Sequence, residues 1–132
     1  MKRKILFLCT GNSCRSQMAE GFAKKLGWDA HSAGTHPETA VNQNAIKVMN
    51  EIGIDINHHK PKSLDSYLDQ HFNIVANLCD DAKYSCPVFN GNSDSIIHQS
   101  FKDPANALGS KEDIINEFRE VRDLIKAWIY SL

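Results

Sequence analysis

Short apolar runs of strand length alternate with amphipathic stretches of helical spacing along almost the whole chain. The first run, residues 4–8, is followed by a polar loop and then by a stretch in which Met18, Phe22 and Ala23 share one helical stripe. Alternation of this kind predicts an α/β domain in which helices pack against a parallel sheet. The pattern predicts strands over 4–8, 29–32, 72–78 and 95–101, and helices over 13–26, 43–52, 63–68 and 110–128. Ser63 and Ser110 are the expected N-caps of the last two helices, and Leu26 and Leu124 are expected on the apolar stripes of the first and the last.

The chain has 132 residues, which is enough for one packed domain and too few for two. We therefore predict a single domain over residues 1–132, with a four-stranded parallel sheet flanked by helices. Ligands of such sheets bind beyond the carboxyl ends of the strands. Predicted strands lead directly into Cys9, Gly34, Cys79 and Asp103, so we expect these four residues to converge at one edge of the sheet.

Composition limits the partners and the compartment. The formal net charge of −1 and the pI of about 6.6 give no overall basic field, so we expect no nucleic acid. No apolar run approaches the roughly 20 residues that span a bilayer. Residues 1–8 carry a basic start and an apolar run too short for a secretory signal, which predicts a cytoplasmic protein without a membrane. No large apolar stripe is left over, which favours a monomer.

The loop between the first strand and the first helix has the residue types of an oxyanion site. Its expected binding residues are Thr10, Gly11, Asn12, Ser13, Cys14, Arg15 and Ser16. Gly11 and Asn12 tolerate a positive φ, which lets backbone N–H groups turn inward at a helix N-terminus. Arg15 adds a planar donor for two oxygens of a tetrahedral anion. The same groups and the Ser16 hydroxyl are expected to lower the pKa of Cys9 and to make it a nucleophile.

The other candidate residues are expected to have structural roles and not catalytic or metal-binding ones. Cys14 is expected to be an inert packing cysteine, and the six histidines are expected to have surface or turn roles. The four cysteines form no closely spaced pair of the metal-binding kind, and His58 and His59 lack partners at ligand spacing. We therefore predict no metal and no cofactor.

The order of motifs resembles a known family. The segment 9–21, together with motifs at 32–34, 53–56, 78–79, 86–87, 103–105 and 118–123, is similar to the thioredoxin-coupled arsenate reductases. That family shares the fold of the low-molecular-weight tyrosine phosphatases. The resemblance implies that arsenate forms an adduct on Cys9 and that Cys79 and Cys86 then carry a disulfide outward to thioredoxin. The polar segment 80–94 is expected to be a loop that rearranges during this relay.

A tyrosine phosphatase of the same fold is the alternative enzyme, because it uses the same loop. Asp103, held before Pro104, is the candidate acid in either chemistry. Such phosphatases usually have a proline where this chain has Gln17, and aromatic residues where it has the small residues 105–107. Arsenate reduction is therefore favoured. A redox-sensing or oxyanion-binding module without turnover is the non-enzymatic alternative.

Some of the reductases that the chain resembles bind potassium near the loop. Asn12, Glu20 and Ser32 match three of the positions involved, whereas Lys60 and Lys62 fall at others. A lysine ammonium carries the same charge as the ion, so we expect little or no potassium dependence.

Overall fold

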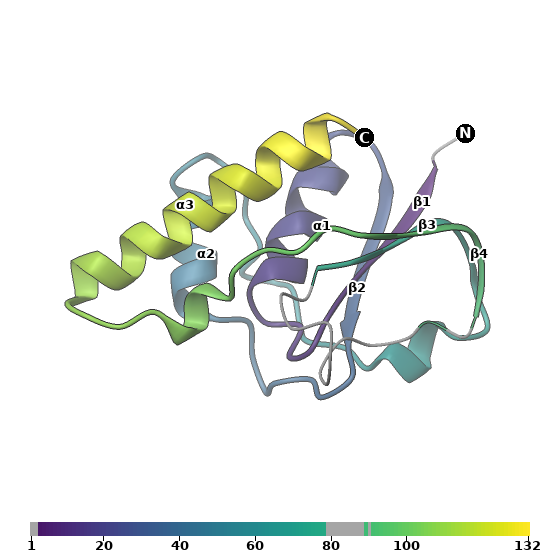
Figure 1. Ribbon diagram of the computed structural model, residues 1–132, viewed down its shortest axis with the longest axis horizontal. Coiled ribbons are helices and arrows are strands. Elements are labelled where there is room, and N and C mark those ends of the chain that lie inside the picture. The colour runs from purple at the N-terminus through teal and green to yellow at the C-terminus, as the bar shows by residue number, and fades with distance from the viewer. Residues whose placement is uncertain (1–2, 79–88, 90) are drawn as a thin grey trace.

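The computed structural model describes residues 3–78, 89 and 91–132, and Cys79 and Cys86 lie outside these residues. It contains one four-stranded parallel sheet in the order β2-β1-β3-β4 (Figure 1). The strands are β1 (Lys4–Cys9), β2 (Asp29–Gly34), β3 (His71–Asn77) and β4 (Asn92–His98). The predicted α/β class and the four parallel strands are confirmed.

The central strand β1 carries the loop of interest at its carboxyl end. Ile5, Leu6, Phe7 and Leu8 are all buried, as expected for a strand covered on both faces. Cys9 ends β1 in register with Gly34 of β2, and Leu8 lies opposite Asn77 of β3. The loop after Cys9 therefore starts between two neighbouring strand ends.

Three helices cover one face of the sheet: α1 (Arg15–Lys25), α2 (Gln43–Asn50) and α3 (Lys111–Tyr130). Figure 1 shows α3 passing over α1 and beside α2, and all three share an apolar core with Ile5 and Phe7 of β1. The predicted Ser110 cap of α3 is part of a capping box with Asp113. Leu26 and Leu124, expected on buried stripes, are instead 45% and 61% exposed; Leu26 lies just beyond the last residue of α1.

In the described part of the chain, a short helix packs on the opposite face of the sheet. A short 3₁₀ helix, η1 (Leu64–Tyr67), begins after Ser63, whose side chain accepts a hydrogen bond from Asp65 N as expected for a cap. Leu64 and Tyr67 pack with Leu6 and Leu8 of β1. Alternate residues of β1 therefore belong to two separate apolar cores: Ile5 and Phe7 to one, Leu6 and Leu8 to the other.

The predicted boundaries of the last strand are wrong by three residues. We expected 95–101, but β4 is Asn92–His98, so residues 92–94 of the expected loop belong to the sheet. Because β4 is an edge strand, backbone pairing with β3 defines it although most of its side chains are exposed, Ile96 by 61%. The chain then reaches a second 3₁₀ helix, η2 (Pro104–Asn106), just before α3. In the described part of the chain, no helix has the length and apolar character that crossing a bilayer requires.

We expect Gly34→Ala to destabilise the fold and to disturb the loop. A methyl group at this position would collide with the backbone oxygen of Thr10 and lie 3.0 Å from that of Cys9, and backbone cannot move aside cheaply. Overpacking of this kind costs about 1–3 kcal/mol. Denaturant unfolding measures the loss, and Thr35→Ala at the next, exposed position is the control, for which less than about 0.5 kcal/mol is expected. Equal stability of the two variants would contradict the close packing of β2 against the loop.

Candidate active site

The loop between β1 and α1 is held by its carbonyl groups. Those of Thr10, Gly11 and Ser13 each accept a 2.9 Å hydrogen bond from a backbone N–H of the segment 36–42. With these carbonyls turned toward that segment, the N–H groups of Asn12 and Ser16 are free to approach the Cys9 sulfur, to which both donate. The inward-facing amides predicted from the sequence are therefore present at two positions.

Asn12 has the special conformation of this loop. Its φ of 50° is the one positive φ of a non-glycine residue in the described chain, whereas Gly11, expected to share it, has none. The Asn12 side chain is fully buried, and its Oδ1 accepts a 2.8 Å bond from the backbone N–H of Lys62. Because a backbone N–H can only donate, this contact fixes which end of the amide is oxygen. The Nδ2 end then donates to Ser16 Oγ at 2.8 Å.

The Ser16 hydroxyl faces the proposed nucleophile. Its oxygen lies 2.8 Å from Cys9 Sγ, and since that oxygen accepts from Asn12, its own proton is available for the sulfur. Cys9 is only 2% exposed. Burial raises the pKa of the Cys9 thiol, and it outweighs the lowering influences of Ser16, the Arg15 charge and the loop amides. The expected lowering of this pKa below its ordinary value is therefore wrong, because the sulfur is cut off from water.

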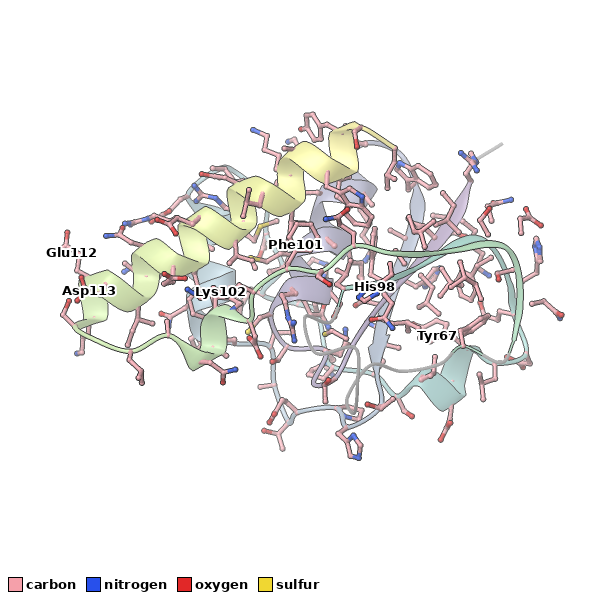
Figure 2. The ribbon with its side chains drawn as sticks, in the orientation of Figure 1. Tyr67, His98, Phe101, Lys102, Glu112 and Asp113 are labelled. Carbon is pink, nitrogen blue, oxygen red and sulfur yellow. The ribbon has the colours of Figure 1, made fainter. Side chains whose placement is uncertain are left out.

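Arg15 joins the loop to a distant segment. Its guanidinium donates to the carbonyl of Phe101 at 3.1 Å and lies 3.5 Å from the carboxylate of Asp103. Figure 2 labels Phe101 on the stretch that leads from β4 toward α3. Asp103 also caps η2 by accepting from Ala105 N at 3.0 Å. The structure thus brings the candidate acid and the anion-binding arginine together.

The remaining sequence candidates differ in their surroundings. Cys14 is buried in the apolar core, and burial raises the pKa of its thiol to about 12, in keeping with the inert role expected for it. Cys79 and Cys86 lie outside the described residues; Leu78, directly before the first of them, donates its N–H to the Leu8 carbonyl at 2.9 Å. Leu8 directly precedes Cys9, the last residue of β1. Leu78 is therefore bonded beside the carboxyl end of β1.

Two residues beside the loop were not predicted. Gln17 is fully buried and donates to Asn12, and His59, expected at the surface, has a side chain only 4% exposed. His59 lies 3.0 Å from Gln17 Oε1 through its Nδ1. Burial lowers the pKa of His59 to about 4, so this histidine is neutral near physiological pH. No local signal identifies the contact between His59 and Gln17, because 42 residues separate them.

A buried carboxylate behind the loop is already neutralised by lysine. Glu20 is 3% exposed and accepts from Ser32 Oγ at 2.6 Å, while Lys24 Nζ lies 2.7 Å and Lys62 Nζ 3.4 Å from it. Burial works to raise the pKa of Glu20, but the bonds from Lys24 and Ser32 outweigh it and the pKa is lowered. These residues do not fit a potassium ion, because the lysine ammoniums already occupy the carboxylate. In the described residues, no group of three histidine, cysteine or acidic side chains is arranged to hold a metal.

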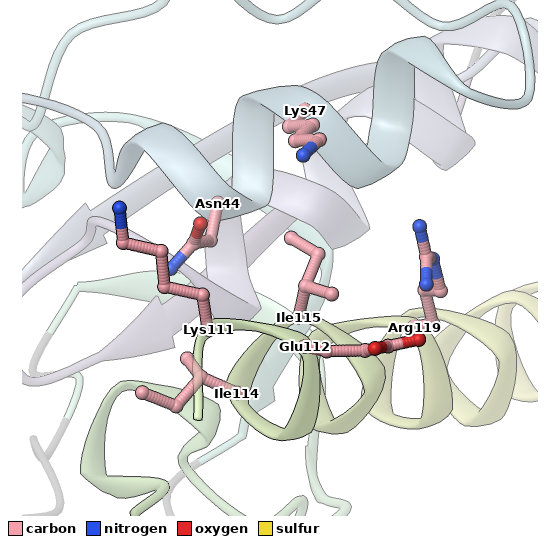
Figure 3. Close-up of a pocket in the computed structure, with 7 residues that line it drawn as sticks. All are labelled: Asn44, Lys47, Lys111, Glu112, Ile114, Ile115 and Arg119. Atoms are coloured by element: carbon pink, nitrogen blue, oxygen red, sulfur yellow. The ribbon is translucent and has the colours of Figure 1, made fainter. Parts of the chain in front are cut away.

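A surface hollow of about 520 Å³ lies elsewhere, between α2 and α3 (Figure 3). Asn44 and Lys47 line it from α2, and Lys111, Ile115 and Arg119 line it from α3. Among the described residues, no predicted site residue lines it. We regard it as a groove between packed helices and not as part of the active site.

Known proteins resemble this chain over nearly its full length. The sequence pattern of the family described as low molecular weight phosphotyrosine protein phosphatase matches residues 4–132. The chain is 49% identical over 127 residues to an arsenate reductase of Halalkalibacterium halodurans, covering 94% of this chain and 90% of that protein. It is 46% identical over 131 residues to arsenate reductase 1 of Staphylococcus epidermidis, covering 97% and 93% respectively.

Solved structures show the same fold. An arsenate reductase in the phosphate binding state superimposes with a TM-score of 0.82 at 30% identity, over 98% of this chain and 95% of that one. A low molecular weight protein tyrosine phosphatase from T. tengcongensis superimposes with a TM-score of 0.68 at 28% identity, over 99% and 100%. The resemblance read from the sequence is thereby confirmed. On its sequence and on its fold, the chain belongs to the low molecular weight phosphotyrosine protein phosphatase family.

Proposed function

We propose that this chain reduces arsenate to arsenite, with Cys9 as the nucleophile and thioredoxin as the final electron donor. The observation that supports this site is the position of the Cys9 sulfur, which lies against Ser16 in a loop that Arg15 completes. The likeness to curated arsenate reductases supports arsenate as the substrate. The fold alone does not separate arsenate from a phosphate ester, since both are tetrahedral oxyanions.

The first step places arsenate against the loop amides and Arg15, whose planar donors suit two oxygens of the anion. At neutral pH arsenate is largely a dianion, and one of its oxygens takes the proton of the Cys9 thiol. Burial raises the pKa of the Cys9 thiol, but the thiolate still forms because the bound substrate itself serves as the base. The thiolate attacks arsenic, an S–As bond forms and one oxygen departs as water. Asp103, next to Arg15, relays the proton to that oxygen.

The second stage carries the electrons. The Cys79 thiolate attacks the Cys9 sulfur, the electron pair of the S–As bond goes to arsenic, and arsenite leaves with arsenic reduced by two electrons. A Cys9–Cys79 disulfide is the oxidised product. Cys86 then attacks Cys79 and frees Cys9, and thioredoxin reduces the Cys79–Cys86 disulfide. Each step is a thiolate displacement, so it needs an attacking thiolate, a suitable attack geometry and access to the target sulfur.

We place this reaction in the cytoplasm, where thioredoxin keeps thiols reduced, and we propose that the protein acts as a monomer without a cofactor. The alternative function is aryl phosphate hydrolysis by the same loop. It uses Cys9, Arg15 and Asp103 but neither Cys79 nor Cys86. We therefore propose weak phosphatase activity beside the reductase activity.

We expect Cys79→Ser to abolish arsenate turnover with thioredoxin and its reductase, while slow hydrolysis of an aryl phosphate persists. The substitution removes the sulfur that attacks the Cys9 adduct, but it leaves the Cys9 loop unchanged. Cys9→Ser is the matched control, and it should abolish both activities. Loss of both activities in Cys79→Ser, or of neither, would contradict the relay.

Peptide mapping supplies the direct check. Wild-type protein treated with arsenate, without added reductant, should accumulate a disulfide between Cys79 and Cys86. A disulfide that includes Cys14 would argue against the scheme, because its raised pKa of about 12 keeps that thiol protonated.

Exchange of potassium for sodium at constant ionic strength should leave steady-state arsenate reduction unchanged. The reason is that Lys24 and Lys62 already supply the positive charge at Glu20. Initial rates over a range of arsenate concentrations measure the effect. A several-fold gain in potassium would show that the lysines leave room for the ion.

A further inference from the structure

A line of hydrogen bonds runs from a buried histidine to the Cys9 sulfur. It passes from His59 through Gln17 and Asn12 to Ser16. Asn12 lies in the loop, Ser16 and Gln17 lie in the first turn of α1, and His59 lies in the segment after α2. The described buried side chains leave no nitrogen or oxygen atom without a hydrogen-bond partner, so this line is fully satisfied.

The orientation of the Gln17 amide is determined by its neighbours. Three oxygens lie 3.1 Å from Nε2: the Asn12 carbonyl, the Asn12 side-chain Oδ1 and the carbonyl of Lys60. An amide rotated by half a turn would place its own oxygen against all three, which is unfavourable in a buried site. Nε2 therefore donates, and Oε1 faces His59 Nδ1 at 3.0 Å.

This orientation in turn fixes the tautomer of His59. Oε1 of Gln17 can only accept, so Nδ1 of the neutral imidazole must carry the proton. Glu20 Oε2 lies 3.5 Å from the same nitrogen and favours a proton there as well. His59 therefore begins a chain in which every donor points toward Cys9.

We propose that Gln17 is a positioning residue for the nucleophile: it holds Asn12 in its positive-φ conformation so that Ser16 donates to the Cys9 sulfur. Gln17 Nε2 donates to two atoms of Asn12, the backbone carbonyl and Oδ1. The same nitrogen also donates to the carbonyl of Lys60. A positive φ is unfavourable for a residue with a side chain, so the surroundings must hold it. Bonds aligned in one direction also polarise one another, which strengthens the last bond of the chain.

This inference rests on Cys9 being the nucleophile, as proposed above, but not on arsenate being the substrate. The test therefore uses the full chain with Cys79→Ser and Cys86→Ser, in which only Cys9 and the protonated Cys14 remain. The first readout is the rate of Cys9 alkylation by iodoacetamide at neutral pH. The second is the dissociation constant of inorganic phosphate. Arsenate turnover of the variants in the wild-type background is measured separately. Absence of turnover would contradict the proposed function, but it would not decide the role of Gln17.

Gln17→Met keeps the size of the side chain but removes its donors and acceptor. We expect alkylation of Cys9 to slow by about fivefold or more, because the sulfur loses its aligned donor. We expect phosphate to bind several-fold more weakly, because Asn12 and the loop amides beside it are no longer held in place. His59→Ala leaves Gln17 in place and removes only the group that orients it. It should change both readouts in the same direction by a smaller factor, and it covers the case in which Gln17→Met does not fold.

Met18→Leu is the matched control, because Met18 is the next residue of α1 and is fully buried outside the hydrogen-bonded line. Thermal unfolding of each variant measures the loss of stability. A merely structural role for Gln17 predicts lower stability with Cys9 alkylated at the parent rate or faster, since loosening exposes the sulfur. That result, or equal slowing in Met18→Leu, would overturn the proposal.

Discussion

The chemistry of this protein depends on how a sulfur without access to water is allowed to carry negative charge. Burial of Cys9 raises the pKa of its thiol, which works against the thiolate that the proposed reaction requires. The same exclusion of water strengthens each hydrogen bond and charge that faces the sulfur. Ser16, Arg15 and two backbone N–H groups supply these interactions. The loop is thus built to favour the thiolate once a basic oxyanion has taken the proton.

The sheet explains why these groups meet. β1 lies between β2 and β3, so the loop after Cys9 emerges beside two other strand ends. Gly34 at the end of β2 leaves no room for a side chain against the loop carbonyls, and Leu78 after β3 bonds to β1. Asp103 reaches Arg15 from the segment that follows the edge strand. Four distant parts of the chain are needed to complete one anion site.

Features fixed by neighbours in sequence could be predicted, and features fixed by distant contacts could not. The Cys9 loop, the buried strand before it and the Ser110 cap each depend on a few consecutive residues. The limits of β4 depend on pairing with β3, so the apolar pair at 96–97 misplaced the strand. Burial of His59 and the role of Gln17 arise from contacts 42 residues apart. The rise of the Cys9 pKa likewise reflects burial by the whole fold and no local motif.

The account is tested most directly by titrating the Cys9 thiolate through its ultraviolet absorbance, in full-length protein whose second and third relay cysteines are serine. Cys14 is replaced by alanine in the same protein, because burial raises the pKa of its thiol as well and its absorbance would overlap with that of Cys9. If the hydroxyl of Ser16 supports the charged sulfur, Ser16→Ala shifts the midpoint upward by about one to two pH units, the worth of one bond to a charged group. An unchanged midpoint would mean that this contact does not stabilise the thiolate.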